Sequence, residues 1–491
     1  MRPAIVLFGD SITQQSFRPG GWGAALADTY SRKADVVLRG YGGYNTRWAL
    51  FLLHHIFPLD SSKPPVATTI FFGANDAALS GRTSERQHVP VNEYKENLKK
   101  IVHHLKKCSP TMLIVLITPP PVDEEGRNEY ARSLYSENAR ELPERTNEVT
   151  GTYAQQCIQL ANELGVRAID VWSKMQETEE WQKKFLSDGL HLTPEGNAVV
   201  YQEVVRVFNE AWLCAEEMPY DFPDYSEIDG SNPKKAFEES SCSSTRGEQS
   251  RAEQRPAIVL FGDSITRQSF RPGGWGAALA DTYSRKADVV LRGYGGYNTR
   301  GALFLLHHIF PLDSSKPPVA TTIFFGANDA SLLGRKSERQ HVPVDEYKEN
   351  LKKIVHHLKK CSPTMLIVLI TPPPVEEEGR NEYASENARE LPGKTNEVTG
   401  TYARQCVQLA NELGVRAIDV WSKMQETEGW QKKFLSDGLH LTPEGNTVVY
   451  QEVVRVFNEA WLCAEEMPFD FPHHSEIDGS NPKKAFEERC L

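Results

Sequence analysis

The chain of 491 residues lacks the features that would place it in a membrane or on a nucleic acid. It has no apolar run that approaches the roughly 20 residues of a membrane-spanning helix. Its net charge of −11 is opposite in sign to the basic excess typical of nucleic-acid-binding domains. An apolar strand-like segment begins directly after MRP, which leaves no room for a secretory signal there. We therefore expect a cytoplasmic protein with no membrane segment and no nucleic-acid partner.

Cysteine motifs are also missing. The eight cysteines include no CxxC pair, so the sequence offers no zinc or dithiol motif. Six of them occupy three equivalent positions in two similar halves, and an odd number in each half is not typical of a secreted disulfide framework. We expect reduced thiols, no metal and no cofactor.

The sequence does contain a repeat of itself. The segments AIVLFGDSIT, RGYGGYNTR, TTIFFGAND and SDGLHLTPEGN occur twice in the same order, and the copies differ by about sixteen substitutions and one gap. The repeat predicts two domains, residues 1–239 and 255–491, joined by a flexible polar linker at 240–254. Such a linker spans roughly 20 Å, so the domains should lie close together without needing a fixed interface. A recent tandem duplication and a mistaken fusion of adjacent genes both fit this pattern.

Each copy also keeps its own tail, because residues 220–239 resemble residues 469–488. Before the tail, short apolar segments rich in β-branched residues alternate with amphipathic ones. The expected strands of the first copy are AIVLF, DVVLRG, TTIFF, TMLIVLIT and VRAIDVW, and the expected helices are Gly23–Lys33, Thr46–Ile56, Val91–Lys107, Asn147–Leu164 and Pro194–Glu217. This alternation predicts a doubly wound α/β domain with a parallel sheet.

The residues that carry chemistry follow the expected strands, where reactive groups of such sheets gather. A serine hydroxyl becomes a nucleophile when a base takes its proton, and that base needs an orienting partner. Asp188 and His191, three residues apart, can supply both to Ser11. The backbone N–H groups of Ser11 and Gly43 and the side-chain amide of Asn75 can stabilise an oxyanion. The pattern predicts a serine hydrolase site, and its equivalents in the second copy are Ser264, Asp437, His440, Gly296 and Asn328.

These segments together resemble the GDSL esterase/lipase family, also called SGNH hydrolases. FGDS, the glycine of GGYNT, GAND and DGLH match in order in both copies, and the likeness is greatest to short plant-type enzymes related to isoamyl-acetate-hydrolysing esterase. The resemblance implies three-layer α/β/α flavodoxin-like domains, and a serine-dependent carboxylic ester hydrolase of small to medium esters, with a role in lipid metabolism. It also implies triads of Ser11, Asp188 and His191 and of Ser264, Asp437 and His440, with oxyanion holes at Gly43, Asn75, Gly296 and Asn328. The chain has no GxSxG nucleophile elbow, which distinguishes it from ordinary α/β-hydrolases.

Two other functions fit parts of the sequence. A carbohydrate O-acetyl esterase would use the same triad. However, no sequence motif indicates a sugar-binding surface, and the missing signal segment argues against a substrate in the cell wall. A non-catalytic ester- or lipid-binding tandem module would not need an intact triad in both halves. In that case the Asp188–His191 pair would only fix a loop.

Several further residues have simpler explanations. The pairs His54-His55 and His103-His104 diverge on a helix, so they are more typical of solvated or partly buried histidines than of metal ligands. We expect Arg47 to pair on the helix surface. Asp76 could orient a loop, without a catalytic role. The prolines Pro119–Pro121 should shape the pocket wall and could include a cis bond.

Two differences between the copies lie near the expected sites. Trp48 is replaced by Gly301, and Gln14 by Arg267. If Trp48 faces the acyl pocket, the second copy should accept bulkier esters. If it faces the core, the second copy is only less stable. We therefore hypothesise that the two domains differ in substrate range.

Overall fold

The computed structural model describes residues 2–135, 143–228, 235–237, 255–384, 392–479 and 481–487. The expected linker at 240–254 lies outside these residues. The first half contains strands β1 Ala4–Gly9, β2 Asp35–Gly40, β3 Ala67–Phe71, β4 Leu113–Ile117 and β5 Arg167–Ile169. Its helices are α1 Ser11–Gln14, α2 Trp22–Thr29, α3 Thr46–Ile56, α4 Val91–Cys108, α5 Glu124–Tyr135, α6 Asn147–Leu164, α7 Val171–Gln176, α8 Trp181–Phe185 and α9 Pro194–Ala211.

The second half repeats this order. Its strands are β6 Ala257–Gly262, β7 Asp288–Gly293, β8 Ala320–Phe324, β9 Leu366–Ile370 and β10 Arg416–Ile418. Its helices are α11 Ser264–Arg267, α12 Trp275–Thr282, α13 Thr299–Ile309, α14 Val344–Cys361, α15 Glu377–Ala384, α16 Asn396–Leu413, α17 Val420–Gln425, α18 Trp430–Phe434, α19 Pro443–Ala460 and α20 Pro482–Glu487.

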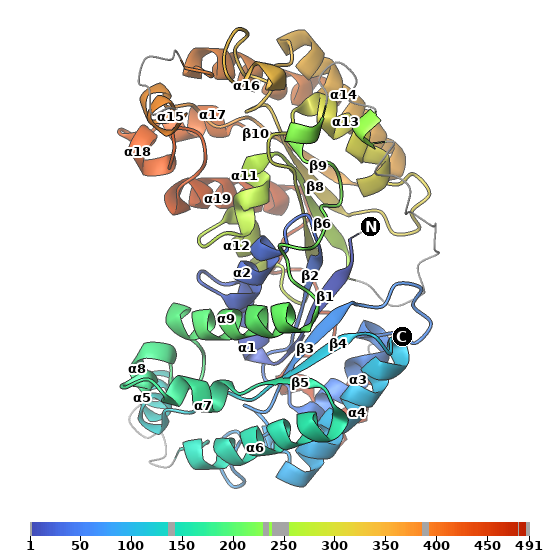
Figure 1. Ribbon diagram of the computed structural model, residues 1–491, viewed down its shortest axis with the longest axis vertical. Helices are drawn as coiled ribbons and strands as arrows, with labels where there is room; N and C mark the ends of the chain where they lie inside the picture. Colours follow the sequence, from blue (N-terminus) through green and yellow to red (C-terminus); the bar gives the residue numbers. More distant parts are fainter. Residues whose placement is uncertain are drawn as a thin grey trace.

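Each half is built on a five-stranded parallel sheet with strand order β2-β1-β3-β4-β5 or its equivalent β7-β6-β8-β9-β10. This is the flavodoxin-like order of doubly wound sheets. The two halves occupy the two ends of an elongated molecule (Figure 1). The predicted fold, two tandem α/β/α domains with parallel sheets, is confirmed.

The three layers follow from the two-residue period of the buried strands. In β1, Ile5 and Leu7 pack into a core with α2 and α9, whereas Val6 and Phe8 pack on the other face with α3, α4 and α6. All four side chains are at most 4% exposed. Helices therefore cover both faces of the sheet, and the reactive loops can emerge only at its edges.

The expected helices α3 and α6 begin and end at the predicted residues, and α9 begins at Pro194 as predicted. The last expected strand was too long, because the segment VRAIDVW pairs with β4 only over Arg167–Ile169. Asp170 then ends the strand by accepting a hydrogen bond from the Ser173 backbone N–H at 3.0 Å, which caps α7. The helices α5, α7 and α8 were not predicted.

The two halves form a reciprocal interface, which corrects the expectation that none was needed. Arg39 on β2 makes two hydrogen bonds of 2.7 and 2.8 Å to Asp288 on β7, and its equivalent Arg292 binds Asp35 at 2.6 and 2.8 Å. Phe17 and Phe270 meet edge to face, with their ring centroids 5.8 Å apart. One continuous apolar core includes residues of both halves.

The two tails are exchanged across this interface. After Asp221, the first tail crosses to the second half, where Tyr297 donates to the Pro223 carbonyl at 2.8 Å and Phe237 stacks on Phe304. The second tail crosses to the first half in the same way. There Tyr44 donates to the Pro472 carbonyl at 2.7 Å, and Phe486 on α20 stacks on Phe51. Each half is therefore completed by a segment that the repeat assigned to the other copy.

Candidate active site

The strand register brings three loops together at one end of the first sheet. Gly9, which ends β1, pairs with Gly40 at the end of β2 and with Phe71 at the end of β3. Ser11, Gly43 and Asn75 follow these three paired residues by two, three and four positions. Because the paired strands are parallel, all three residues emerge at the same edge of the sheet.

Ser11 is held at the first turn of the short helix α1. The buried side chain of Asp10 caps this helix by accepting a hydrogen bond from the Ile12 N–H at 2.9 Å. Burial raises the pKa of Asp10 to about 7. The capping bond fixes the backbone on both sides of Ser11 and so positions its side chain at the start of the helix.

His191 and Asp188 come from the loop between α8 and α9. The His191 Nε2 atom lies 2.9 Å from the Ser11 hydroxyl, and its Nδ1 atom lies 2.8 Å from the Asp188 carboxylate. The other carboxylate oxygen accepts the backbone N–H groups of Leu190 and His191 at 3.1 and 2.8 Å. Gly189 has φ +78°, a conformation that favours glycine and lets the loop fold back on itself. The loop therefore carries both the imidazole and its orienting carboxylate.

Asp188 remains ionised in this environment. Burial alone would raise its pKa, but the hydrogen bonds and charge of His191, together with the charge of Arg127, hold the pKa well below its usual range. An ionised carboxylate favours the ring tautomer with the proton on Nδ1, which leaves Nε2 free to accept the proton of Ser11.

The two expected oxyanion residues are each fixed by a neighbour. Gly43 has φ +78°, and its carbonyl accepts a hydrogen bond from Gln87 at 3.1 Å. The Asn75 side chain is 4% exposed, and its amide nitrogen donates to the Tyr44 carbonyl at 2.8 Å. One of the two amide hydrogens is thereby used, and the other is left to act as a donor.

The exchanged tails reach these glycines. A methyl group placed on Gly43 would lie 2.4 Å from the His474 ring, and one on Gly296 would lie 2.8 Å from Tyr225. His474 and Tyr225 are equivalent tail residues, so the expected oxyanion turn of each half is covered by a different side chain from the other copy. Burial lowers the pKa of His474 to about 4, so the ring is neutral at physiological pH.

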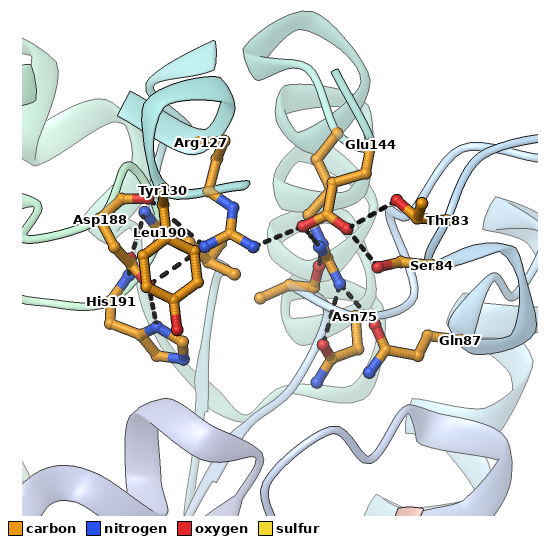
Figure 2. Close-up of polar contacts among 12 residues, drawn as sticks. Asn75, Thr83, Ser84, Gln87, Arg127, Tyr130, Glu144, Asp188, Leu190 and His191 are labelled. Atoms are coloured by element: carbon orange, nitrogen blue, oxygen red, sulfur yellow. Dashed lines mark hydrogen bonds and ion pairs between the residues drawn. The ribbon is translucent and has the colours of Figure 1, made fainter. Parts of the chain in front are cut away.

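A polar network that sequence reasoning missed connects the two sides of this site (Figure 2). Arg127 on α5 donates to Asp188 at 3.1 Å and to Glu144 at 2.5 Å. Glu144 also accepts from Arg145 at 2.5 Å, and Arg145 donates to the Asn75 side-chain oxygen at 3.1 Å. Burial would raise the pKa of Glu144, but its basic neighbours and Ser84 lower it to about 2. None of the repeated sequence segments indicated this network, because Glu144 and Arg145 lie in a stretch without a regular pattern of apolar residues.

The second site has the same central geometry. Ser264 lies 2.9 Å from His440 Nε2, and His440 Nδ1 lies 2.7 Å from Asp437. Asn328 donates to the Tyr297 carbonyl at 2.8 Å, and Gly296 has φ +80°. All the predicted site residues therefore lie together in two separate sites, one in each half.

The two substitutions noted in the sequence have different structural settings. Trp48 is 1% exposed and packs edge to face against Tyr44 among the residues of the apolar core. Gln14 accepts the Gly42 backbone N–H at 2.7 Å, next to Gly43, the expected oxyanion residue. Arg267, its replacement, has no acceptor atom and cannot make the equivalent bond.

The remaining expectations concern residues outside the two sites. Arg47 forms a two-point ion pair with Glu93, as expected for a helix surface. Asp76 accepts hydrogen bonds from Thr46 and so holds the loop that leads into α3. His104 is buried and contacts the Phe57 carbonyl through Nε2 at 2.7 Å.

Three further observations apply to the residues that the structure describes. No peptide bond among them is cis, so the prolines at 119–121 are all trans. No three His, Cys, Asp or Glu side chains in the described ranges are grouped as metal ligands, and the six described cysteines are free. None of the described helices is both long and apolar enough to cross a membrane.

Comparison with known proteins gives matches for both halves. The family model described as GDSL-like Lipase/Acylhydrolase matches residues 5–204 and 258–453. A GDSL esterase/lipase of Arabidopsis thaliana is 77% identical over 239 residues, which are 49% of this chain and 99% of that protein. An isoamyl acetate-hydrolyzing esterase 1 homolog of Bos taurus is 42% identical over 238 residues, 47% of this chain and 90% of that protein. Among solved structures, the lipase/acylhydrolase from Enterococcus faecalis matches with a TM-score of 0.34 and 24% identity over 44% of this chain and all of that one.

Proposed function

Because this chain belongs to the GDSL-like lipase/acylhydrolase family and is therefore a carboxylic ester hydrolase, we propose that it carries two serine-dependent active sites. Ser11 and Ser264 are the nucleophiles of these sites. The observation that carries the proposal is the contact of each serine hydroxyl with a histidine nitrogen at 2.9 Å, on a ring held by an aspartate.

The reaction at the first site follows from this geometry. His191 Nε2 takes the proton of Ser11 as the serine oxygen attacks the ester carbonyl, and Asp188 stabilises the imidazolium that forms. The backbone N–H groups of Ser11 and Gly43 and the Asn75 amide donate to the oxyanion. His191 then returns the proton to the leaving alcohol. Water, activated in the same way, releases the acid from the acyl-enzyme.

We propose small to medium esters as the substrates. One relative is named an isoamyl acetate-hydrolyzing esterase 1 homolog, and the 238 residues that match it span 90% of its length. The side chains of His474 and Tyr225 over the oxyanion glycines also restrict the space beside each site. Short aliphatic acetates are therefore the first substrates to test.

The test uses the full-length chain with one or both serines replaced. S11A and S264A should each keep the activity of the other site on short p-nitrophenyl and aliphatic esters. The double variant should lose about 10³- to 10⁶-fold in turnover. S133A, which replaces an exposed serine on α5, is the matched control and should retain full activity.

Labelling with a fluorophosphonate probe gives an independent readout. The unaltered chain should carry two modified serines, each single variant one, and the double variant none. Full turnover by the double variant would refute the assignment of the nucleophiles. Release of acetate from acetylated xylan, with no activity on aliphatic esters, would instead identify a carbohydrate O-acetyl esterase.

A further inference from the structure

The two halves differ in how the oxyanion asparagine is held. In the first half, Arg145 is a buried guanidinium that donates to the Ala74 carbonyl at 2.7 Å and to the Asn75 side-chain oxygen at 3.1 Å. The Asn75 amide nitrogen donates to Tyr44. Both ends of the amide are therefore fixed, and its free N–H can point in only one direction.

Arg145 also supports the second oxyanion residue through one intermediate. It donates to the Gln87 side-chain oxygen at 2.6 Å, and Gln87 donates to the Gly43 carbonyl at 3.1 Å. A guanidinium presents several donors in a rigid plane, so one side chain can hold three acceptors at once. Glu144 orients this plane and links it through Arg127 to Asp188.

In the second half this arrangement is broken at two adjacent positions. Gly393 stands in place of Glu144, and Lys394 in place of Arg145. Lys394 donates to Ser331 and, at 3.4 Å, to Gln340, whose own bond to the Gly296 carbonyl is 3.3 Å.

The consequence for the second oxyanion asparagine is a loss of support on one side. Among the contacts of the described residues, none joins Lys394 to the Asn328 oxygen. Arg380 still binds Asp437 at 2.9 Å, so the support of the triad is retained while the support of the oxyanion hole is reduced.

We propose that Glu144 and Arg145 are positioning residues that preorganise the oxyanion hole of the Ser11 site, and that their replacement by Gly393 and Lys394 makes the Ser264 site the slower of the two. This inference rests on the proposed function. A less fixed donor weakens stabilisation of the transition state more than binding of the uncharged ester, so the difference falls on kcat rather than KM.

The experiment exchanges these residues between the two sites. In the S264A chain, where only Ser11 reacts, E144G/R145K should lower kcat about 5- to 30-fold with KM nearly unchanged, a smaller loss than removal of a whole oxyanion donor. E163Q removes an exposed ion pair with Lys95 on the same half and should leave kcat unchanged.

The reciprocal variant tests whether the kcat of the Ser264 site can be raised. In the S11A chain, S331A/G393E/K394R should raise kcat of the Ser264 site by a similar factor. The added side chain has room, because a methyl group placed on Gly393 meets its nearest atom, the Ser337 hydroxyl oxygen, at 3.4 Å. The S331A change restores the alanine that the first half has at this position, Ala78.

The outcomes separate this inference from the proposed function. A fall in kcat with E144G/R145K and a rise with the reciprocal variant support the inference. An unchanged kcat in the Ser11 site overturns it, and so does a reciprocal variant that folds and labels fully but gains nothing. If E144G/R145K fails to fold, the kcat of the reciprocal variant alone decides whether the inference holds. Activity that survives loss of both serines refutes the proposed function instead.

Discussion

The exchange of tails predicts that a substitution in α20, which follows the second half in sequence, impairs the Ser11 site rather than the Ser264 site. Phe486 on α20 is 8% exposed and stacks on Phe51 of α3, with ring centroids 4.7 Å apart and planes 12° from parallel. The same tail places His474 over Gly43. Replacing Phe486 with alanine should therefore loosen the cover of the Ser11 site.

The expected magnitude follows from the burial of the ring. Phenylalanine-to-alanine changes in protein cores cost about 3–5 kcal/mol. Because the Phe51 ring on which Phe486 stacks is itself only partly buried, we expect the lower end, about 3 kcal/mol. A loss of this size shifts the docking equilibrium of the tail by roughly 100-fold, since about 1.4 kcal/mol corresponds to a tenfold change.

The assay compares the two sites in the intact chain. In the S264A chain, F486A should change the KM and kcat of the Ser11 site on a series of p-nitrophenyl esters. In the S11A chain, the same change should leave the Ser264 site within twofold of its original activity. Thermal unfolding should show the loss of stability in the first half.

The other tail supplies a matched control. Phe237 is also 8% exposed and stacks on Phe304, so F237A should impair the Ser264 site and spare the Ser11 site. If F486A instead impairs the Ser264 site, each tail folds back on its own half and the exchange is wrong. Equal loss at both sites would mean that the tail supports the whole molecule and covers neither site.

Two further predictions concern the differences between the halves. Replacing buried Trp48 with alanine should lower the free energy of unfolding by about 3–5 kcal/mol, while the acyl-chain preference of the Ser11 site stays the same; a changed preference would contradict its place in the core. Burial, together with repulsion from Arg380, lowers the pKa of Lys394 to about 7, while an unfolded lysine keeps its proton to about pH 10. Since the unfolded chain then binds more protons between pH 7 and 10, the free energy of unfolding of the second half should rise over that range. K394M should therefore raise the melting temperature more at pH 6, where the buried lysine is charged, than at pH 9. Equal increases at the two pH values would show that burial of the charged lysine does not destabilise the fold.

Much of the site could be predicted because its residues are fixed by local rules. The strands are continuous apolar segments, which is typical of strands buried on both faces of a parallel sheet, and several of the expected helices follow capping residues such as Thr193. The triad acid and base lie on one turn, so their contact needs only the loop that contains them. The register of parallel strands then brings Ser11 to the same edge as Gly43 and Asn75.

Other predictions remain untested by the fold. The cytoplasmic location, the domain boundaries at 239 and 255 and the preference for small to medium esters stay predictions. The hypothesis that the halves differ in substrate range loses its support from Trp48, which lies in the core. It gains a different basis in His474 and Tyr225, which cover equivalent turns in the two halves.

The sequence by itself determined the two-copy organisation, the α/β elements and the chemical groups of each site, because repeats, periodicity and caps are properties of neighbouring residues. Only the tertiary structure decided which tail covers which site. The two tails are nearly identical, so their contact energies with either half are similar and no local pattern distinguishes them. The choice depends on the path of the chain across the interface formed by Arg39, Asp288 and their equivalents, which is a property of the folded molecule.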